Sequence, residues 1–542
     1  KDSGATPGTC HGAGRAGSVS HQYRFFCDLF IIPEEFSRAS PIRSGVISTD
    51  ASAVQKTGRE RTNTPSIFTG NMGRISSTPP GIPHSCQTMK RGGVLRHSSS
   101  TSIAPLRSVT DVLCPFCGTL CDDLEVVVTD DGKTIVDVYN ACAIGAEKFM
   151  HAQAKDRVKR PRMQQADGTY KEVSYDEAVE YTAQMLANAR KPLMYGWSST
   201  SCEAQSVGHE IAEKVGAIVD NTATVCHGTT LIAVQDVGIP SCTLGEIKNR
   251  ADRILFWGCN PAHAHPRHQS RYSIFPRGFF TNKGHKNRKV VVVDPRRTDT
   301  AKMADYHFQI EQGRDYELLS AFRVAIRGEW LPDTVAGIPK ERIYEAAEML
   351  KSGRFGIIFF GMGVTQSLSK NHNIDNAIML TKDLNDYTKF SIMAMRGHYN
   401  VTGSGQVMGW QFGFPYATDL SRGFARYNPG ETTSNDLLVR GEVDAVFVIG
   451  SDPGAHFPIS SVKKISQLPS VCVDPHITPT SEVSKLHVPV AFVGVEVGGN
   501  CYRMDNVPID ARKVVDPPEG MLTDEEFLTR VNQRLDQLME VE

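Results

Sequence analysis

The sequence predicts an α/β protein with parallel sheets, made of a small cysteine-bearing domain and a duplicated strand–helix unit. Short β-rich runs such as "KVVVVD" (289–294) and "DAVFVIG" (444–450) alternate with helical stretches, an order typical of crossovers between parallel strands. The chain also aligns with itself. Residues 252–266 match 444–458, and residues 291–310 match 471–490, with Asp-Pro and Thr positions shared.

The composition is that of an ordinary globular protein. The chain has 542 residues, 40% apolar and 22% charged, with a net charge of −1, and its length favours several domains. We expect no nucleic-acid partner and no membrane span, because there is no positive excess and the apolar runs have the length of strands. An odd count of thirteen cysteines without a secretory signal favours reduced thiols and a cytoplasmic protein.

Residues 1–107 differ from the rest of the chain. They are rich in Ser, Gly, Thr, Pro and Arg and lack a sustained helical or strand period, which predicts an irregular or disordered basic tail. One fragment, "QYRFFCDLFIIPEEF" (22–36), is apolar enough to dock on a folded surface. A targeting peptide and an upstream start-site artefact are the alternatives for this tail.

The cysteine-bearing domain is predicted at 108–165. Its cysteines, Cys114, Cys117, Cys121 and Cys142, follow the spacing C-x2-C-x3-C-x20-C. Zinc prefers two short-spaced pairs, whereas three close cysteines and one distant one suit a cubane [4Fe–4S] cluster. The pattern favours the cluster, with a zinc site and unliganded thiols as alternatives.

Two α/β regions follow, predicted at 166–350 and 351–542. The first begins with an amphipathic helix at 174–190, and the second ends in a helical tail, "TDEEFLTRVNQRLDQLM" (523–539). In each repeat, loops with Asn/Asp-Pro leave the carboxyl ends of strands, where open α/β sheets bind nucleotides. The repeats therefore predict two nucleotide-like sites.

Two further motifs lie outside the repeats. "NTATVCHGTTL" places Cys226 before His227, which is weak evidence alone because most such cysteines are small buried apolar residues. "MRGHYNVTGSGQ" places Arg396 in a Gly-rich loop. A guanidinium fits a carboxylate bidentately, and a structural arginine at a phosphate is the alternative.

The cysteine pattern upstream of a duplicated unit resembles the molybdopterin oxidoreductase superfamily, over residues from about 108 to 510. The resemblance implies a [4Fe–4S] cluster that feeds W or Mo, held with a sulfido ligand by two pyranopterin guanine dinucleotides. It also implies that Cys226 ligates the metal, that His227 handles hydride or proton transfer and that Arg396 anchors the substrate. Many members carry a Lys two residues after the last cluster cysteine, where this chain has Ile144, with Lys148 the nearest lysine.

The remaining loops are predicted cofactor contacts. One guanosine site is assigned Asn260, Asp294, Arg296, Thr298, Gly313 and Asp315. The other pterin environment is assigned Gly361, Met362, Gly363, Gln366, Asp452, Asp474 and Thr478, and four more contacts are His265, Gly397, His398 and His456. His263, His265 and His268 suggest zinc, but the second repeat keeps only His456, which opposes a zinc site.

Three phrases narrow the resemblance. "CPFCGTLCDDLEV", "TVCHGTT" and "MRGHYNVTG" are similar to the family of formylmethanofuran dehydrogenase B subunits, which lack the C-terminal β-barrel cap. The resemblance implies reduction of CO2 to formate, a separate β-barrel subunit over the pterins, an amidohydrolase-type subunit that receives formate, and polyferredoxin or other iron–sulfur subunits. The alternatives are a self-contained formate dehydrogenase and a cofactor-free scaffold of a formyltransferase/hydrolase complex. The retained cluster cysteines and Cys226 oppose the scaffold.

Overall fold

The computed structural model describes residues 105–155 and 157–540. The predicted tail and its apolar fragment at 22–36 therefore lie almost entirely outside the described residues. The described residues all belong to one compact unit. Within the described ranges, no helix has the length and apolar character that a membrane crossing requires.

A small antiparallel sheet opens the described chain. It consists of β1 (Leu106–Val112), β2 (Leu124–Thr129) and β3 (Ile135–Tyr139) in the order β1-β2-β3, followed by α1 (Ala143–His151). Alternate residues of β2 are buried, because successive side chains of a strand point to opposite faces. They pack against Phe149 of α1, and this leaves the β1–β2 loop and the start of α1 at the same end.

A five-stranded parallel sheet carries the first repeat. Its order is β10-β9-β8-β13-β14, with β8 (Arg253–Trp257), β9 (Lys289–Val293), β10 (Tyr306–Phe308), β13 (Phe355–Phe360) and β14 (Lys389–Ala394). All six residues of β13 are buried, as expected for a strand covered on both faces. The longer helices of this part are α4 (Gly228–Val237), α5 (Leu244–Arg250), α8 (Asp315–Ile326), α9 (Lys340–Lys351) and α11 (Asn371–Asn385). Its short elements are α6 (Pro261–Ala264), α7 (His268–Arg271), α10 (Met362–Thr365), β11 (Thr334–Val335) and β12 (Ile338–Pro339).

A nine-stranded sheet carries the second repeat, in the order β16-β15-β7-β6-β17-β18-β19-β4-β5. Its strands are β4 (Arg162–Gln164), β5 (Tyr170–Glu172), β6 (Pro192–Gly196), β7 (Ile218–Asn221), β15 (Thr418–Asp419), β16 (Arg426–Tyr427), β17 (Ala445–Ile449), β18 (Ser470–Val473) and β19 (Leu486–Val488). The central five strands are parallel, and the pairs at both edges are antiparallel. A separate hairpin is formed by β20 (Gly499–Tyr502) and β21 (Pro508–Ala511).

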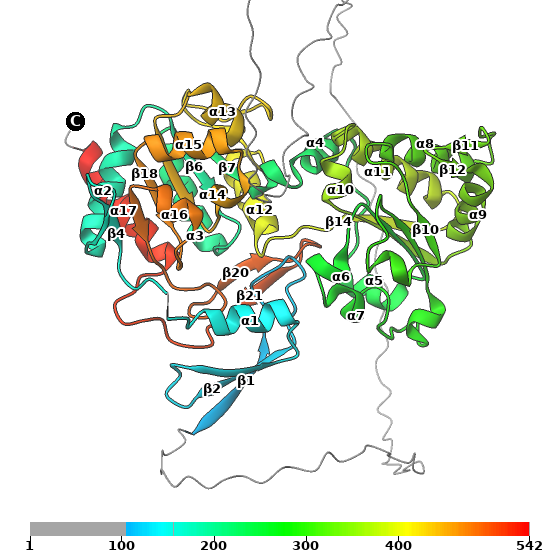
Figure 1. The fold of residues 1–542 in the computed structure, drawn as a ribbon, viewed down its shortest axis with the longest axis horizontal. Coiled ribbons are helices and arrows are strands. Elements are labelled where there is room, and N and C mark those ends of the chain that lie inside the picture. The colour runs from blue at the N-terminus through cyan, green and yellow to red at the C-terminus, as the bar shows by residue number, and fades with distance from the viewer. Residues whose placement is uncertain (1–104, 156, 541–542) are drawn as a thin grey trace, which may run out of the picture. The chain divides into compact units, whose positions relative to one another are not determined.

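Helices from both ends of the chain pack together around this larger sheet. They are α2 (Tyr175–Asn188), α3 (Cys202–Lys214), α12 (Val401–Phe412), α13 (Ser434–Arg440), α14 (Pro453–His456), α15 (Ile459–Gln467), α16 (Pro479–Val483) and α17 (Asp524–Met539). The predicted helix at 174–190 is α2, which begins with a capping box between Ser174 and Glu177. The predicted helical tail is α17, which packs on α2 and α3 (Figure 1).

The strand pairing corrects the predicted division at 350/351. β13 and β14 follow that boundary but pair with β8, so the boundary separates strands of one sheet. Conversely, β6 and β7 precede it, yet β6 pairs with β17 of the second repeat and β7 pairs with β6. A buried apolar strand can pair its backbone with any parallel neighbour of similar length. The sequence pattern therefore located these strands without specifying their partners.

Candidate functional site

Three of the four predicted cluster cysteines lie on one loop. Cys114, Cys117 and Cys121 occupy the connection from β1 to β2, which a 2.8 Å hydrogen bond from Cys114 N to Cys121 O closes. Cys142 is the N-cap of α1, and its Sγ accepts from Gly145 N at 3.3 Å. A Cβ on Gly145 would lie 3.2 Å from Cys114 Sγ and 3.7 Å from Cys142 Sγ. Cys142, the cysteine distant in sequence, therefore lies near the loop, and Gly145 lies beside the sulfur atoms of both Cys114 and Cys142.

The thiols of this quartet act on one another electrostatically. Burial raises the pKa of Cys114 well above its usual value, and the other three cysteines raise it further. Within residues 105–155 and 157–540, no three His, Cys, Asp or Glu side chains lie close enough to hold a single metal ion. The four cysteines lie where the β1–β2 loop meets the start of α1.

Cys226, the predicted metal ligand, lies between β7 and α4. A 3-10 turn at Thr222–Val225 follows β7, and the Asn221 side chain caps it by accepting from Ala223 N at 2.9 Å. The Cys226 side chain is buried, and burial raises its pKa to about 11 against the opposing charge of Arg396. A bound cation would favour the thiolate, the form that ligates metals.

A buried carboxylate fixes the strand end before Cys226. One oxygen of Asp220 accepts from Asn221 N and Ala417 N, and the other accepts from the N–H and hydroxyl of Ser434, all at 2.6–3.1 Å. Burial raises the pKa of Asp220 to about 6. Asp220 thus joins the Cys226 loop to a segment some two hundred residues later.

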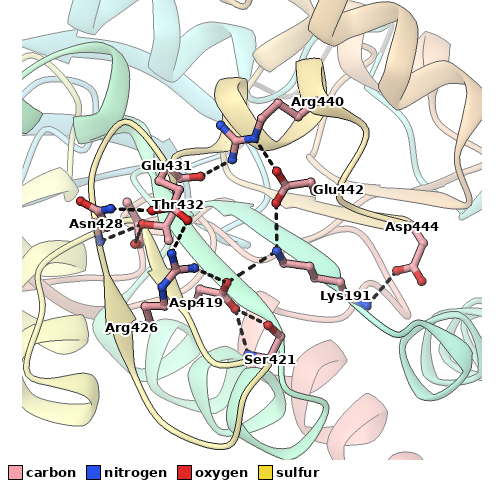
Figure 2. Close-up of polar contacts among 11 residues, drawn as sticks. Lys191, Asp419, Ser421, Arg426, Asn428, Glu431, Thr432, Arg440, Glu442 and Asp444 are labelled. Carbon is pink, nitrogen blue, oxygen red and sulfur yellow. Dashed lines mark hydrogen bonds and ion pairs between the residues drawn. The ribbon is translucent and has the colours of Figure 1, made fainter.

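That later segment is itself held by ion pairs (Figure 2). Asp419 is buried between Lys191 at 3.6 Å and Arg426 at 3.7 Å. The other labelled members of the network are Ser421, Asn428, Glu431, Thr432, Arg440, Glu442 and Asp444. Water screens the buried charge of Asp419 less than it screens exposed pairs, and Asp419 lies on β15, which pairs with the strand that precedes the Cys226 loop.

The loop after β13 approaches the first repeat at backbone distance. Gly363 N donates to Gly258 O at 2.9 Å, and a Cβ on Gly361 would lie 2.6 Å from Cys259 Cβ. From the same loop, Gln366 Nε2 donates to the carbonyl of Cys226 at 3.1 Å. The predicted Gly-rich segment thus connects the first repeat to the predicted metal ligand.

His227 is buried and hydrogen-bonded through both ring nitrogens. Nδ1 lies 3.1 Å from the Thr230 hydroxyl, and Nε2 lies 3.3 Å from the Met395 carbonyl, which can only accept and so assigns the proton to Nε2. Burial, and then the charge of Arg396, lower the pKa of His227 to about 3. In this geometry the ring is neutral and supports the backbone beside Arg396.

The backbone around Arg396 is held at three consecutive carbonyls by three parts of the chain. His227 reaches the carbonyl that precedes Arg396. His265 Nε2 donates to the carbonyl of Arg396 itself at 2.8 Å. Gly118 N donates to the carbonyl of Gly397 at 3.1 Å. The Cys226 loop, the first repeat and the cysteine loop therefore converge on one segment.

The contact at Gly118 leaves no room for a side chain. A Cβ there would lie 2.4 Å from the Arg396 carbonyl oxygen, a separation that would force the backbone apart. The guanidinium of Arg396, by contrast, has neither a hydrogen-bond nor an ion-pair partner among the residues that the structure describes. Burial lowers its pKa against the charge of Cys226. The cation is thus available to an anionic ligand beside Cys226.

The two repeats form their loops with matching hydrogen bonds. In the first, Thr300 Oγ1 donates to Asn260 Oδ1 at 2.7 Å. In the second, Thr480 Oγ1 donates to Asp452 Oδ1 at 2.5 Å. Each threonine oxygen also accepts from the backbone N–H two residues after its partner, at 3.2 and 2.8 Å. Asn260 and Asp452 are therefore held by equivalent contacts.

The second loop of each repeat matches as well. Asp294 and Asp474 each accept from the backbone N–H two residues on, at 2.8 and 2.9 Å. Thr298 and Thr478 each accept from the N–H three residues on, at 3.2 Å. Burial, and then Asp452 among nearby carboxylates, raise the pKa of Asp474 to about 7. These four predicted residues hold the shapes of their loops.

Asp315, a predicted guanosine contact, is already engaged inside the protein. Its two oxygens accept from Trp257 Nε1 at 2.9 Å and from the Ser367 hydroxyl at 2.7 Å. Gly313 has φ +92 and lies against Leu368, where a Cβ would come within 2.9 Å. The turn at 312–315 thus contacts Ser367 and Leu368, which directly follow the glycine-containing segment at 361–366.

The other predicted residues lie near the surface or have separate partners. Arg296, Met362, Gln366, His398 and His456 are exposed. The three histidines that suggested zinc contact different groups: His263 the Asp299 carboxylate, His265 the Arg396 carbonyl, and His268 the Ser273 hydroxyl. They do not form one metal site.

Sequence reasoning missed three kinds of supporting residue. Thr300 and Thr480 were aligned by the internal repeat but not assigned to the site, although the shared position was a usable signal. Gly118 had a weaker signal, as a glycine inside the cysteine motif. Nothing in the local sequence distinguishes Asp220, because its donors come from a distant segment.

Comparisons with known proteins show the family of the chain. A family model described as molybdopterin oxidoreductase matches residues 157–520. The B subunit of tungsten-containing formylmethanofuran dehydrogenase 2 of Methanocaldococcus jannaschii is 56% identical over 425 residues, covering 78% of this chain and 97% of the relative. The chain belongs to the molybdopterin oxidoreductase family, among the formylmethanofuran dehydrogenase B subunits. The protein of the same name from Methanococcus maripaludis is 54% identical, with 79% of this chain and 99% of the relative covered.

A solved structure shares the molybdopterin oxidoreductase fold. It is a chain from the crystal structure of the formyltransferase/hydrolase complex of Methylorubrum extorquens with methylofuran. The TM-score is 0.57 at 20% identity, and the match covers 68% of this chain and 98% of that chain. The molybdopterin oxidoreductase fold, with mixed α/β structure and parallel sheets, is thus common to both.

Proposed function

We propose that this chain is the catalytic redox subunit of a formylmethanofuran dehydrogenase complex, which reversibly reduces CO2 to formate. The observation that carries the proposal is the position of Cys226 beside the guanidinium of Arg396, whose neighbour Gly397 accepts a backbone hydrogen bond from Gly118 of the cysteine loop. The identity to B subunits of tungsten-containing formylmethanofuran dehydrogenases supports the choice of reaction.

The implied metal centre fits the residues at the site. Cys226 would hold W or Mo, which two pyranopterin guanine dinucleotides and a sulfido ligand would complete. When bound, this centre supplies the two-electron chemistry between CO2 and formate. A thiolate is a suitable soft ligand for such a metal, and burial rather than a neighbouring anion raises the pKa of Cys226.

Arg396 binds the carboxylate of formate through its guanidinium. A planar fork of donors matches two carboxylate oxygens, and the charge persists at all relevant pH values. Because the arginine is preorganised by its three held carbonyls, it stabilises negative charge without rearranging. His227 supports this segment and closes the site beside Cys226.

The two repeats would bind one dinucleotide each at the carboxyl ends of their parallel strands. The matching loops around Asn260 and Asp452, and around Asp294 and Asp474, support this duplication. Gly258 and Gly450 both have φ +56 at the strand ends. Backbone of this kind lets a ligand approach closely.

The cysteine quartet would hold the [4Fe–4S] cluster that exchanges electrons with iron–sulfur partners of the polyferredoxin type. Further proposed partners are a β-barrel subunit that covers the pterins and an amidohydrolase-type subunit that takes up formate for methanofuran formylation. The names of the relatives, which describe them as subunits, support such a complex.

The test replaces the proposed metal ligand. Cys226→Ala should abolish formate oxidation coupled to a viologen dye, because the metal loses its protein thiolate. The [4Fe–4S] spectrum and the fold should persist, since the cysteine quartet lies on the β1–β2 loop and at the start of α1, away from the Cys226 loop. Activity, metal content and the electron paramagnetic resonance (EPR) spectrum would be measured on the purified complex.

Cys242→Ala is the matched control. Cys242 is a half-buried free thiol that packs with the first repeat's core rather than with Arg396, so this variant should retain activity. Substantial turnover by Cys226→Ala with its metal still bound would refute the assignment of Cys226.

A further inference from the structure

Two arginines of the first repeat reach the residues that follow the third cluster cysteine. Arg267 donates to both carboxylate oxygens of Asp123, at 2.5 and 2.7 Å. Arg271, at the end of α7, donates to Asp122 at 2.7 Å and lies 3.0 Å from Asp123. Both aspartates come directly after Cys121 in the sequence. The four charges therefore lie against one corner of the cysteine loop.

Arg271 also acts on the thiol of Cys121 itself. Burial raises the pKa of Cys121 to about 11, and the positive charges of Arg267 and Arg271 beside this thiol oppose that rise. The Cζ atom of Arg271 lies over the ring of Tyr272, 5.0 Å from its centroid. The Cζ atom of Arg503 lies 5.6 Å from the centroid of the same ring. Arg503 is itself paired with Asp505. Arg271 is thus held in place by its ring contact as well as by its ion pairs.

The charges in this group are unequally exposed to water. The side chain of Arg271 is 18% exposed, whereas that of Asp122 is 44% exposed. Water screens an exposed charge more than a buried one. The positive charge should therefore dominate at the sulfur, although the formal charges of the four residues cancel.

We propose that Arg271 is a positioning residue that raises the reduction potential of the cluster through the sulfur of Cys121, opposed by Asp122. The proposal rests on the proposed function, because it requires the [4Fe–4S] cluster in the cysteine quartet. It assigns the arginines a task beyond joining the cysteine domain to the first repeat.

The physical reason is the charge added on reduction. One electron gives the cluster and its four thiolates one more negative charge, so a fixed cation beside a sulfur favours the reduced form. Hydrogen bonds to cluster sulfurs and the local net charge are the terms by which a protein sets such potentials. A nearby anion has the opposite effect, which gives the two residues effects of opposite sign.

The experiment is a redox titration of the cluster, followed by EPR on the purified complex with its partners. Arg271→Gln should shift the midpoint potential to a more negative value, because a cation is lost. Arg271→Lys should restore most of the potential, since it keeps the charge. Asp122→Asn should shift the midpoint in the positive direction, because the anion that opposes Arg271 is lost.

Arg323→Gln is the matched control. Arg323 lies on α8, is part-buried and pairs with Asp383 at 2.7 Å, so its loss removes a similar ion pair outside the cysteine domain. Its midpoint should equal that of the unchanged protein. Damage to the fold would shift both charge variants in one direction or broaden the spectrum, and it would not produce opposite signs.

Two results separate the possible failures. If the unchanged protein shows no [4Fe–4S] signal, the proposed function and this proposal both fail. Suppose the signal is present, but Arg271→Gln and Asp122→Asn either shift the cluster's midpoint potential in the same direction or leave it unchanged. The positioning role alone is then overturned. Should Arg271→Gln lose its cluster, the Lys and Asn variants still give the required comparison.

Discussion

The two repeats use the same internal hydrogen bonds but make different outward contacts. Thr300 with Asn260 and Thr480 with Asp452 hold equivalent loops in two different sheets. Yet the residue that accepts from the threonine is Asn260, a neutral amide, in the first repeat and Asp452, a carboxylate, in the second. The contacts that shape the loop have been kept in both copies, while the charge at the same position differs.

The histidines of these loops also differ in what they contact. His265 of the first repeat donates to the Arg396 carbonyl at 2.8 Å. His456 of the second is hydrogen-bonded to the Tyr195 hydroxyl at 3.2 Å and is exposed. His265 of the first repeat therefore supports the Arg396 segment directly, whereas His456 of the second contacts β6, a central strand of its own sheet. Duplication preserved the loop and left its outward side chains to diverge.

The largest expected effect distinguishes the two threonines. Thr480→Val should lower the free energy of unfolding by about 2–3 kcal/mol, because hydrogen bonds to charged groups are worth more than neutral ones. Thr300→Val should cost about 1 kcal/mol, since its partner is an amide. Valine has nearly the same shape, so packing changes little. Urea unfolding of both variants measures the difference, and equal losses would show that the charge of Asp452 adds nothing.

Much of the fold could be predicted from local sequence. The run at 355–360 is apolar throughout and forms the buried β13, and the Ser174 and Glu177 pair marks the start of α2. The pairing of β13 with β8 could not be predicted, because an apolar strand carries no label for its neighbour. The alignment of the repeats instead suggested a simple division between the two halves.

The site shows the same limit. Cys226, His227 and Arg396 were singled out from short motifs, and the structure brings them together. Asp315 was assigned to a guanosine site as part of the "QGRD" turn at 312–315. Its engagement by Trp257 and Ser367 depends on contacts 52 and 58 residues away in sequence, so no local pattern could reveal it.

A smaller effect should appear when the outward histidine of the first repeat is changed. His265→Leu should raise KM for formate about tenfold, because leaving a buried carbonyl unpaired costs about 1–3 kcal/mol and loosens the Arg396 backbone. His265→Gln retains a donor and should recover most of the affinity. Formate-dependent reduction of a viologen dye measures the KM for formate of both variants.

His456→Leu provides the matched comparison from the second repeat. Its partner is the Tyr195 hydroxyl rather than the arginine segment, so KM for formate should rise less than in His265→Leu. An equal rise in both variants would mean that the histidines act through a shared cofactor contact, and the asymmetry between the repeats would be lost.

The smallest expected effect concerns pH and the carboxylate pair of the second repeat. Burial, and then the neighbouring Asp452 and Asp524, raise the pKa of Asp474 to about 7, well above the value of about 4 for an unfolded aspartate. The folded protein therefore binds this proton more tightly than the unfolded one, and the associated stability is lost as the pH rises from about 4 to about 7. Asp474→Asn removes the ionisation, so the melting temperature of the variant relative to the unchanged protein should increase by a few degrees between pH 5 and pH 8. Calorimetry at the two pH values measures this difference, and an equal change of melting temperature with pH in the variant and the unchanged protein would contradict the raised pKa of the buried Asp474.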